Sequence, residues 1–347
     1  MTDTNTNIDT DTDVDTDTSA NANANADALD TDSQVSSIDH DPLAVDEVAA
    51  LTTRIIDNVE RVIVGHRDAA EDILITMLAR GHLLLEDVPG VGKTMLARSI
   101  ATSLECSFNR VQFTPDLLPP DVTGVNVFDQ QQQVFEFQPG PVFANVVLGD
   151  EINRAPPKTQ AALLEVMAEQ QVTVDGETHA VPDPFTVIAT QNDIEPTQTY
   201  DLPVAEVDRF TKQIRLGYPN ETEEAELLGR VAGHHPIESL EAVATVEDLN
   251  RARETVAATT VSESVRSYVA QLAGYTRDNA RLGVSPRGAI ALVRLAQARA
   301  VFEGRDFVIP DDIHAEIHAA WSHRIQTADT VESARIVDDA LDEVPVE

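Results

Sequence analysis

The sequence predicts an α/β protein with a mostly parallel five-stranded sheet and flanking helices, followed by a smaller all-helical domain. Two observations carry this prediction. Five short apolar runs alternate with helical stretches between residues 42 and 219, and beyond residue 220 amphipathic helices replace the strand-like runs. Strands that alternate with helices are typical of a parallel sheet covered on both faces. Ligands of such sheets bind beyond the carboxyl ends of the strands.

The predicted elements follow in chain order. A first helix is expected over residues 43–62, where apolar residues recur at helical spacing. The five expected strands are His82–Glu86, Asn109–Phe113, Asn145–Gly149, Phe185–Thr190 and Lys212–Leu216. The expected helices of the second domain, residues 220–330, are Glu221–Ala232, Val246–Thr259, Glu263–Arg277, Pro286–Glu303 and Pro310–Trp321.

Both ends of the chain are rich in acid. Residues 1–41 are of low complexity, with eleven Asp and no Lys or Arg. Such a segment has too few apolar residues to offset the entropy of ordering, so we expect a disordered acidic leader. Residues 331–347 are expected to form a frayed acidic tail. Between the leader and the helical domain, the domain that contains the predicted sheet is placed at residues 42–219.

The charge balance is strongly negative. Sixty acidic residues face 24 basic ones, a net charge of −36, and only Lys93, Lys158 and Lys212 are lysines. Strong self-repulsion of this kind is relieved when about 1 M salt shortens the screening length to about 3 Å, so we interpret the composition as halophilic, an adaptation to a salt-rich cytoplasm. The same charge opposes nucleic-acid binding, which needs a positive surface.

Other sequence features restrict the location. No apolar run reaches the length of a membrane span, and the N-terminus lacks the basic and apolar regions of a secretory signal. The one cysteine, Cys106, cannot form an internal disulfide. We expect a cytoplasmic protein without direct membrane insertion.

The strongest motif follows the first strand. Residues 86–94 read EDVPGVGKT and lead into a helical stretch. Glycines let backbone N–H groups curl around phosphates, and the helix N-terminus adds its positive dipole. Lys93 is expected to reach the β- and γ-phosphates of ATP, and the Thr94 hydroxyl to hold Mg²⁺. The residues expected to bind the nucleotide here are Pro89, Gly90, Val91, Gly92, Lys93, Thr94 and Met95.

Two further strands end in polar residues. Asp150 and Glu151 follow the third strand, and with a phosphate-binding loop in the same chain they resemble a Walker B pair. Asp150 would hold Mg²⁺ through water, and Glu151 would orient or deprotonate the attacking water. Asn192, after the fourth strand, could hydrogen-bond that water and the γ-phosphate.

Two arginines complete the set of candidates. Arg209 lies in Asp208-Arg209-Phe210, before the fifth strand, and an arginine supplied by a neighbouring subunit commonly meets the transition-state charge of phosphoryl transfer. Arg287 follows Ser285, the expected N-cap, and Pro286, the expected first helical residue. A cation in a first helical turn opposes the helix dipole, which contact with nucleotide phosphates would explain.

Together these motifs resemble the MoxR family of AAA+ ATPases, a helix-2-insert group related to the ATPase subunits of magnesium chelatase. The similarity spans about residues 64–324, and its most specific stretch is DEINRAPPKTQ at residues 150–160. It implies sensor 1 and sensor 2 roles for Asn192 and Arg287, and an arginine finger at Arg209. It also places Val64 and Gly65 near the adenine.

The resemblance implies further properties. It implies a homo-oligomer, a hexameric ring with ATP between subunits, and two inserted hairpins that face the pore or the client, here Val125–Phe137 and Val172–Val181. Partners would be von Willebrand factor A domain proteins and a client protein complex, whose maturation or metal loading the ATPase would drive. Arg154 and Lys158 lie in the most specific motif, but the sequence gives neither a physical role.

Alternative functions remain at this point. The chain could be a nucleotide-gated assembly scaffold with little hydrolysis, or the ATPase subunit of a chelatase-like machine. Joint presence of Glu151, Asn192 and Arg209 favours hydrolysis. A DNA motor conflicts with the negative charge.

Overall fold

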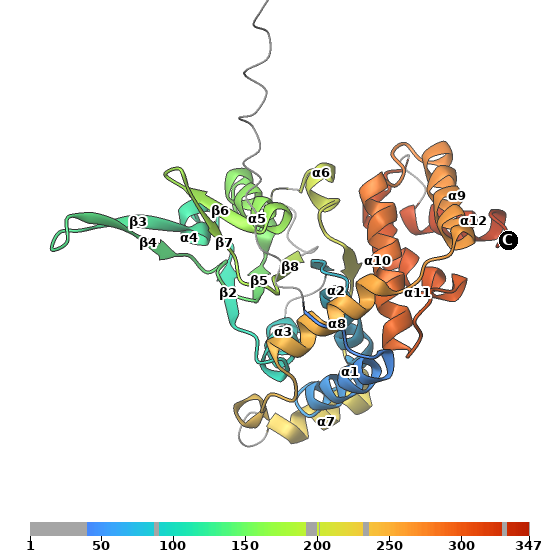
Figure 1. The fold of residues 1–347 in the computed structure, drawn as a ribbon, viewed down its shortest axis with the longest axis horizontal. Helices are drawn as coiled ribbons and strands as arrows, with labels where there is room; N and C mark the ends of the chain where they lie inside the picture. Colours follow the sequence, from blue (N-terminus) through green and yellow to red (C-terminus); the bar gives the residue numbers. More distant parts are fainter. Residues whose placement is uncertain are drawn as a thin grey trace, which may run out of the picture. The chain divides into compact units, whose positions relative to one another are not determined.

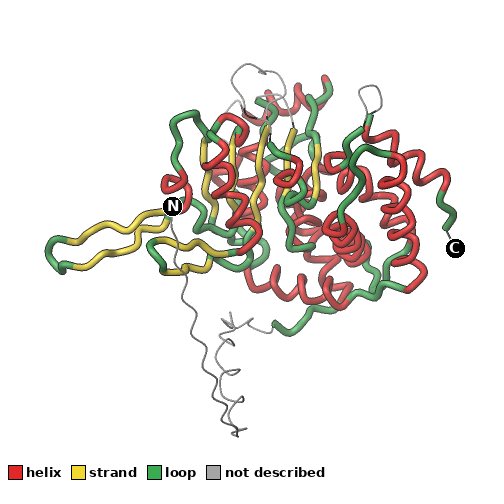
Figure 2. The backbone as a smooth tube through the Cα atoms, turned by 90° about the horizontal axis from the view of Figure 1, so that it is seen from above, coloured by secondary structure: helices red, strands yellow, loops and turns green. Residues whose placement is uncertain are grey.

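The computed structural model describes residues 40–86, 90–191, 200, 202–231, 236–327 and 332–346. Within these residues the predicted sheet is confirmed: five parallel strands lie in the order β2-β5-β8-β1-β9. Figure 2 shows them side by side between helices. The strands are β1 (Leu83–Glu86), β2 (Phe108–Gln112), β5 (Val146–Asp150), β8 (Thr186–Gln191) and β9 (Lys212–Ile214). Their carboxyl ends therefore meet at one edge.

Helices cover both faces of the sheet, because successive side chains of its strands point to opposite faces and enter two separate apolar cores. Leu83 and Leu85 belong to one apolar cluster with α1 (Val45–Glu60), α2 (Arg67–Leu78) and α3 (Lys93–Ser103). Leu84 belongs to a second cluster with α5 (Pro157–Glu169). The first cluster continues into the C-terminal helices, so one core joins the sheet to the second domain.

The C-terminal domain is helical, as predicted. It contains α7 (Glu221–Val231), α8 (Val246–Ala258), α9 (Glu263–Asn279), α10 (Pro286–Phe302), α11 (Pro310–Trp321) and α12 (Ser333–Glu343). Ser285 caps α10 as expected, since its Oγ accepts a hydrogen bond from the backbone N–H of Gly288 at 3.1 Å. The Trp321 indole, fully buried, donates to the Gly288 carbonyl at 3.0 Å and fixes α11 against the start of α10.

The expectation of a frayed tail at residues 331–347 was wrong for its described part. Residues 333–343 form α12, which buries Ile336, Val337 and Ala340. The apolar residues recur at helical spacing within an acid-rich stretch, so one face packs on the domain while the acids face water. Of the expected leader, residues 1–41, residues 1–39 lie outside the described residues, and the described chain begins at His40.

Both predicted hairpins are present. The first hairpin is β3 (Gly124–Asp129) with β4 (Val134–Pro139), and the second is β6 (Gln171–Val174) with β7 (Glu177–Ala180). They follow α4 (Pro119–Thr123) and α5 and extend away from the sheet (Figure 1). The rings of Phe137 and His179 stack 3.9 Å apart, so the hairpins pack on each other. The first hairpin exposes Phe128 and Phe135.

A buried charge cluster ties the sheet to the helical domain. The ammonium of Lys212, at the start of β9, contacts Asp72 of α2 at 2.5 Å and Glu316 of α11 at 2.6 Å. Arg299 of α10 bonds the same Glu316 at 2.7 Å. Two cations thus balance two carboxylates, which such burial requires. Because β9 follows Arg209 closely and α10 carries Arg287, the cluster fixes the elements that hold these two arginines.

Replacing Lys212 with methionine is therefore expected to lower the free energy of unfolding by about 3 kcal/mol. This is the lower end of the range for a broken buried pair, because Glu316 keeps Arg299 while Asp72 loses its closest cation. Chemical unfolding in molar KCl measures it. Lys158→Met, at an exposed position of α5, should change stability by less than about 0.5 kcal/mol. An equal loss in both variants would contradict the assignment.

Candidate functional site

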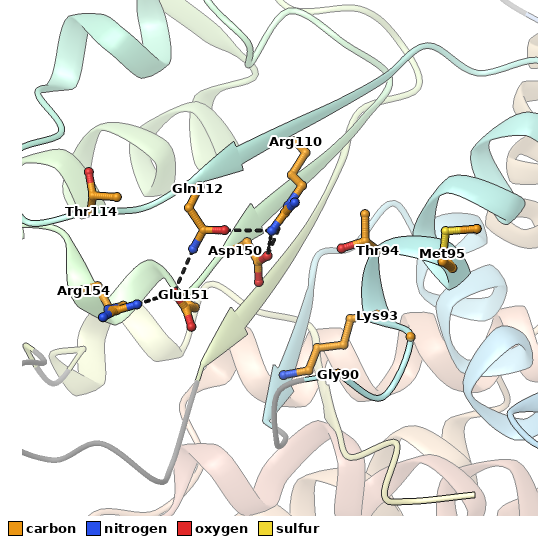
Figure 3. A pocket seen from close by; sticks show the side chains of 11 residues that line it. Gly90, Lys93, Thr94, Met95, Arg110, Gln112, Thr114, Asp150, Glu151 and Arg154 are labelled. Carbon is orange, nitrogen blue, oxygen red and sulfur yellow. Dashed lines mark hydrogen bonds and ion pairs between the residues drawn. The ribbon is translucent and has the colours of Figure 1, made fainter. Parts of the chain in front are cut away.

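The phosphate-binding loop joins β1 to α3. Gly90 and Gly92 have φ of 89° and 97°, a left-handed conformation that favours glycine. Gly92 is the N-cap of α3, which begins at Lys93, so the N–H groups of its first turn have no partner inside the helix. Lys93 and Thr94 extend from this turn into a cavity of about 570 Å³ (Figure 3). Pro89 lies outside the described residues, and Val91 is buried.

Asp150 and Glu151 line the same cavity from the end of β5. The Thr190 hydroxyl of β8 donates to Asp150 Oδ1 at 2.7 Å and accepts from the Glu151 backbone N–H at 2.9 Å. Glu151 has a φ of 55°, which is uncommon for a residue with a side chain. Thr190 of the neighbouring strand thus holds both residues at the carboxyl end of β5, with Glu151 in an uncommon backbone conformation.

Four residues of the cavity lining were missed as site residues in the sequence: Arg110, Gln112, Thr114 and Arg154. Arg110 Nη2 lies 2.5 Å from Asp150 Oδ2. Gln112 Nε2 donates to Glu151 Oε2 at 2.8 Å, and Arg154 Nη1 approaches the same oxygen at 2.8 Å. Figure 3 shows this chain of contacts. One signal was present in the sequence: Arg110 and Gln112 flank the apolar Val111, so in a strand both lie on the same face.

The cavity has the donors that a magnesium–triphosphate group requires. Lys93 and the start of α3 offer positive charge for phosphate oxygens. The Thr94 hydroxyl and the Asp150 carboxylate line the same cavity, and both are oxygen ligands of the kind that Mg²⁺ prefers. Met95 completes this wall. The residues present therefore fit the group.

Arg209 and Arg287 are not among the residues that line this cavity. Together they line a second cavity of about 450 Å³, whose described walls share no residue with the first. Arg209 Nη1 donates to the Leu164 carbonyl, and its Nε has no partner among the described residues. Arg287 Nη1 lies 4.0 Å from Asp208 Oδ2. The structure thus places the two predicted arginines at one cavity, which the phosphate-binding loop of the same chain does not line.

A buried arginine holds this second cavity in shape. Arg324 Nε donates to Asp208 Oδ1 at 2.9 Å, and its Nη2 donates to the Phe210 carbonyl at 2.6 Å. Ser285 Oγ, the cap of α10, donates to both oxygens of Asp208 at 3.0 Å. The segment with Arg209 and the helix start with Arg287 are therefore linked through one carboxylate.

Two other predictions are not met by the cavity linings, one of them because its residue lies outside the described part of the chain. Val64 and Gly65 are not among the residues lining either cavity; a Cβ at Gly65 would lie 2.5 Å from Glu223 Cδ of α7. Asn192 lies outside the described residues, although β8 reaches Gln191 and pairs it with Glu86, just before the phosphate-binding loop. No helix in the described part of the chain is long and apolar enough to cross a membrane.

Comparison with known proteins gives consistent matches. Residues 82–212 match the profile of the ATPase family associated with various cellular activities (AAA), and residues 273–344 match the AAA lid domain. The chain is 48% identical to the Bacillus subtilis protein YeaC over 81% of this chain and 88% of that one. It is 41% identical to Chaperone MoxR1 of Mycobacterium tuberculosis, over 78% and 74%. The crystal structure of an ATPase candidate from Cytophaga hutchinsonii superposes with a TM-score of 0.82 at 36% identity, covering 87% of this chain and 97% of that one.

Proposed function

Because the chain belongs to the MoxR family of chaperone-like AAA+ ATPases, we propose that it hydrolyses ATP with Mg²⁺ and uses the energy to remodel partner protein complexes. The observation that supports hydrolysis most strongly is the convergence of Lys93, Thr94, Asp150 and Glu151 on one cavity at the carboxyl edge of the sheet. In this proposal the loop binds the phosphates, and the acidic pair acts on the metal and on the attacking water.

The residues divide the chemistry between them. Lys93 binds the β- and γ-phosphates, while Thr94 and Asp150 hold the metal, which when bound neutralises charge on the transferred phosphoryl group. Glu151 orients the attacking water and accepts its proton. Asn192, the proposed sensor 1, hydrogen-bonds that water.

Arg209 and Arg287 act on the nucleotide of a neighbouring subunit in this proposal. Both line a cavity apart from the phosphate-binding loop of their own chain, so each needs a second copy to reach phosphates. This favours a homo-oligomer with ATP between subunits, which we propose is a hexameric ring. In such a ring Arg209 stabilises the transition-state charge as an arginine finger.

The partners follow from the family. We propose von Willebrand factor A domain proteins and a client protein complex as partners, with maturation or metal loading of the client as the work done. Both hairpins extend from the sheet, and the first exposes Phe128 and Phe135; they are the surfaces proposed to meet the client. We further propose a cytoplasmic setting without membrane insertion. Because the net charge is −36, we also propose that this setting is rich in salt and that the protein does not bind nucleic acid.

Metal removal tests hydrolysis against the scaffold alternative. In molar KCl, the full chain is expected to release phosphate from ATP with Mg²⁺ and to lose this release when EDTA removes the metal. A colorimetric phosphate assay and nucleotide binding are measured on the same sample. ATP binding without Mg²⁺-dependent phosphate release would contradict hydrolysis and support the scaffold. Co-purification with a chelatase subunit rather than a von Willebrand factor A protein would favour the chelatase-like machine.

A further inference from the structure

The carboxylate of Asp150 is already engaged by a cation of the same chain. Arg110 Nε and Nη2 lie 3.1 and 2.5 Å from Asp150 Oδ2, so two N–H groups point at one oxygen. The other oxygen, Oδ1, accepts the Thr190 hydroxyl at 2.7 Å. A carboxylate oxygen has two lone pairs, so the Arg110 contacts saturate Oδ2.

The proposed function, on which this inference rests, assigns the same carboxylate to a hydrated magnesium ion. A guanidinium and a divalent cation at one carboxylate repel each other, and they compete for the same acceptor sites. We propose that Arg110 is a resident counter-ion of Asp150 that metal-bound nucleotide must displace. Arg110 thereby raises the Mg²⁺ concentration that nucleotide binding requires.

Arg110 has room to leave. It lies on β2, one of the two edge strands of the five-stranded sheet, and 47% of its side chain is exposed. Its long aliphatic stem lets the charged end move into water without crossing the core. Thr190 keeps its hydrogen bond to Oδ1 meanwhile, so the carboxylate stays in position for the metal.

Displacement of Arg110 also changes the surroundings of Glu151. Arg110 Nη2 donates to Gln112 Oε1 at 2.8 Å, which turns the amide so that its Nε2 donates to Glu151 Oε2. When Arg110 leaves, Gln112 loses the bond that orients its amide. Arrival of metal at Asp150 thus weakens one of the contacts that hold Glu151.

The test is the Mg²⁺ dependence of nucleotide binding, followed with a fluorescent ATP analogue on the full chain in molar KCl. Because a hydrogen bond between charged groups is worth about one to two factors of ten, we expect Arg110→Gln to lower the half-saturating Mg²⁺ concentration about tenfold. Arg110→Lys, which keeps the charge but loses the forked geometry, should give an intermediate value. Affinity for the analogue without Mg²⁺ should stay unchanged.

Arg98→Gln is the matched control. Arg98 is exposed on α3, and its substitution removes the same charge near the loop. Nucleotide binding by this variant should therefore depend on Mg²⁺ as it does in wild type. An unchanged or raised Mg²⁺ requirement in Arg110→Gln would overturn the inference, and weaker metal-free binding would make Arg110 a phosphate ligand instead. If wild type itself bound no analogue, the proposed function would fail as well, whereas normal wild-type binding confines the failure to Arg110.

Discussion

Replacing Arg209 with alanine is expected to leave ATP binding intact and to lower turnover about 10³- to 10⁵-fold, the usual effect of losing an arginine finger. Binding survives because Arg209 lines a cavity that shares no described residue with the phosphate-binding loop. Calorimetry with ATP and a phosphate-release assay in molar KCl measure the two effects separately. Arg266→Ala, at an exposed position of α9, is the control and should turn over as wild type does.

Mixing subunits tests delivery between neighbours. A Lys93→Ala subunit cannot hold ATP but still supplies Arg209, and an Arg209→Ala subunit holds ATP but lacks the finger. Mixed assemblies of the two variants should therefore recover part of the activity that both pure variants lack. Absence of any recovery, with mixed assembly verified by tagged pull-down, would argue against Arg209 acting on a neighbour.

The second large effect is expected from Glu151→Gln. The amide keeps the size of the side chain and can still accept hydrogen bonds from Gln112 and Arg154, but it cannot take a proton from water. Phosphate release should fall about 10²- to 10⁴-fold, the usual contribution of a general base, while ATP binding persists.

Glu165→Gln controls for the loss of one negative charge. Glu165 is exposed on α5, the helix that follows Glu151 and Arg154. It should release phosphate at the wild-type rate. Equal phosphate release by wild type and Glu151→Gln would remove Glu151 from the reaction.

Local sequence patterns predicted the elements of this fold well. The strands were recognisable as short apolar runs, of which β1 leads into the Gly-rich loop and β5 into the acidic pair. The second hairpin was recognisable from Asp175 and Gly176, both with positive φ in the structure. Helix α12 was missed because acidic residues are interspersed among its apolar ones. Its apolar residues, Ile336, Val337 and Ala340, fill only one narrow face.

The site was predictable where a motif carries its own geometry, as in the loop around Lys93. It was not predictable where partners come from separate elements. Arg110 meets Asp150 because β2 lies next to β5, and that strand order depends on the whole fold. Arg287 and Arg209 line one cavity because Ser285, at the start of α10, and Arg324 both bind Asp208. Neither arrangement has a local sequence signature.

The central claim, that the Gly90–Thr94 loop holds ATP, is tested most directly by calorimetric titration of ATP with Mg²⁺ into wild type, Lys93→Ala and Lys158→Ala. Lys158 is exposed, and Lys158→Ala is the matched control because it makes the same substitution outside the loop. We expect wild type and Lys158→Ala to bind with equal affinity and Lys93→Ala to show no measurable binding. Unchanged affinity in Lys93→Ala would contradict the account.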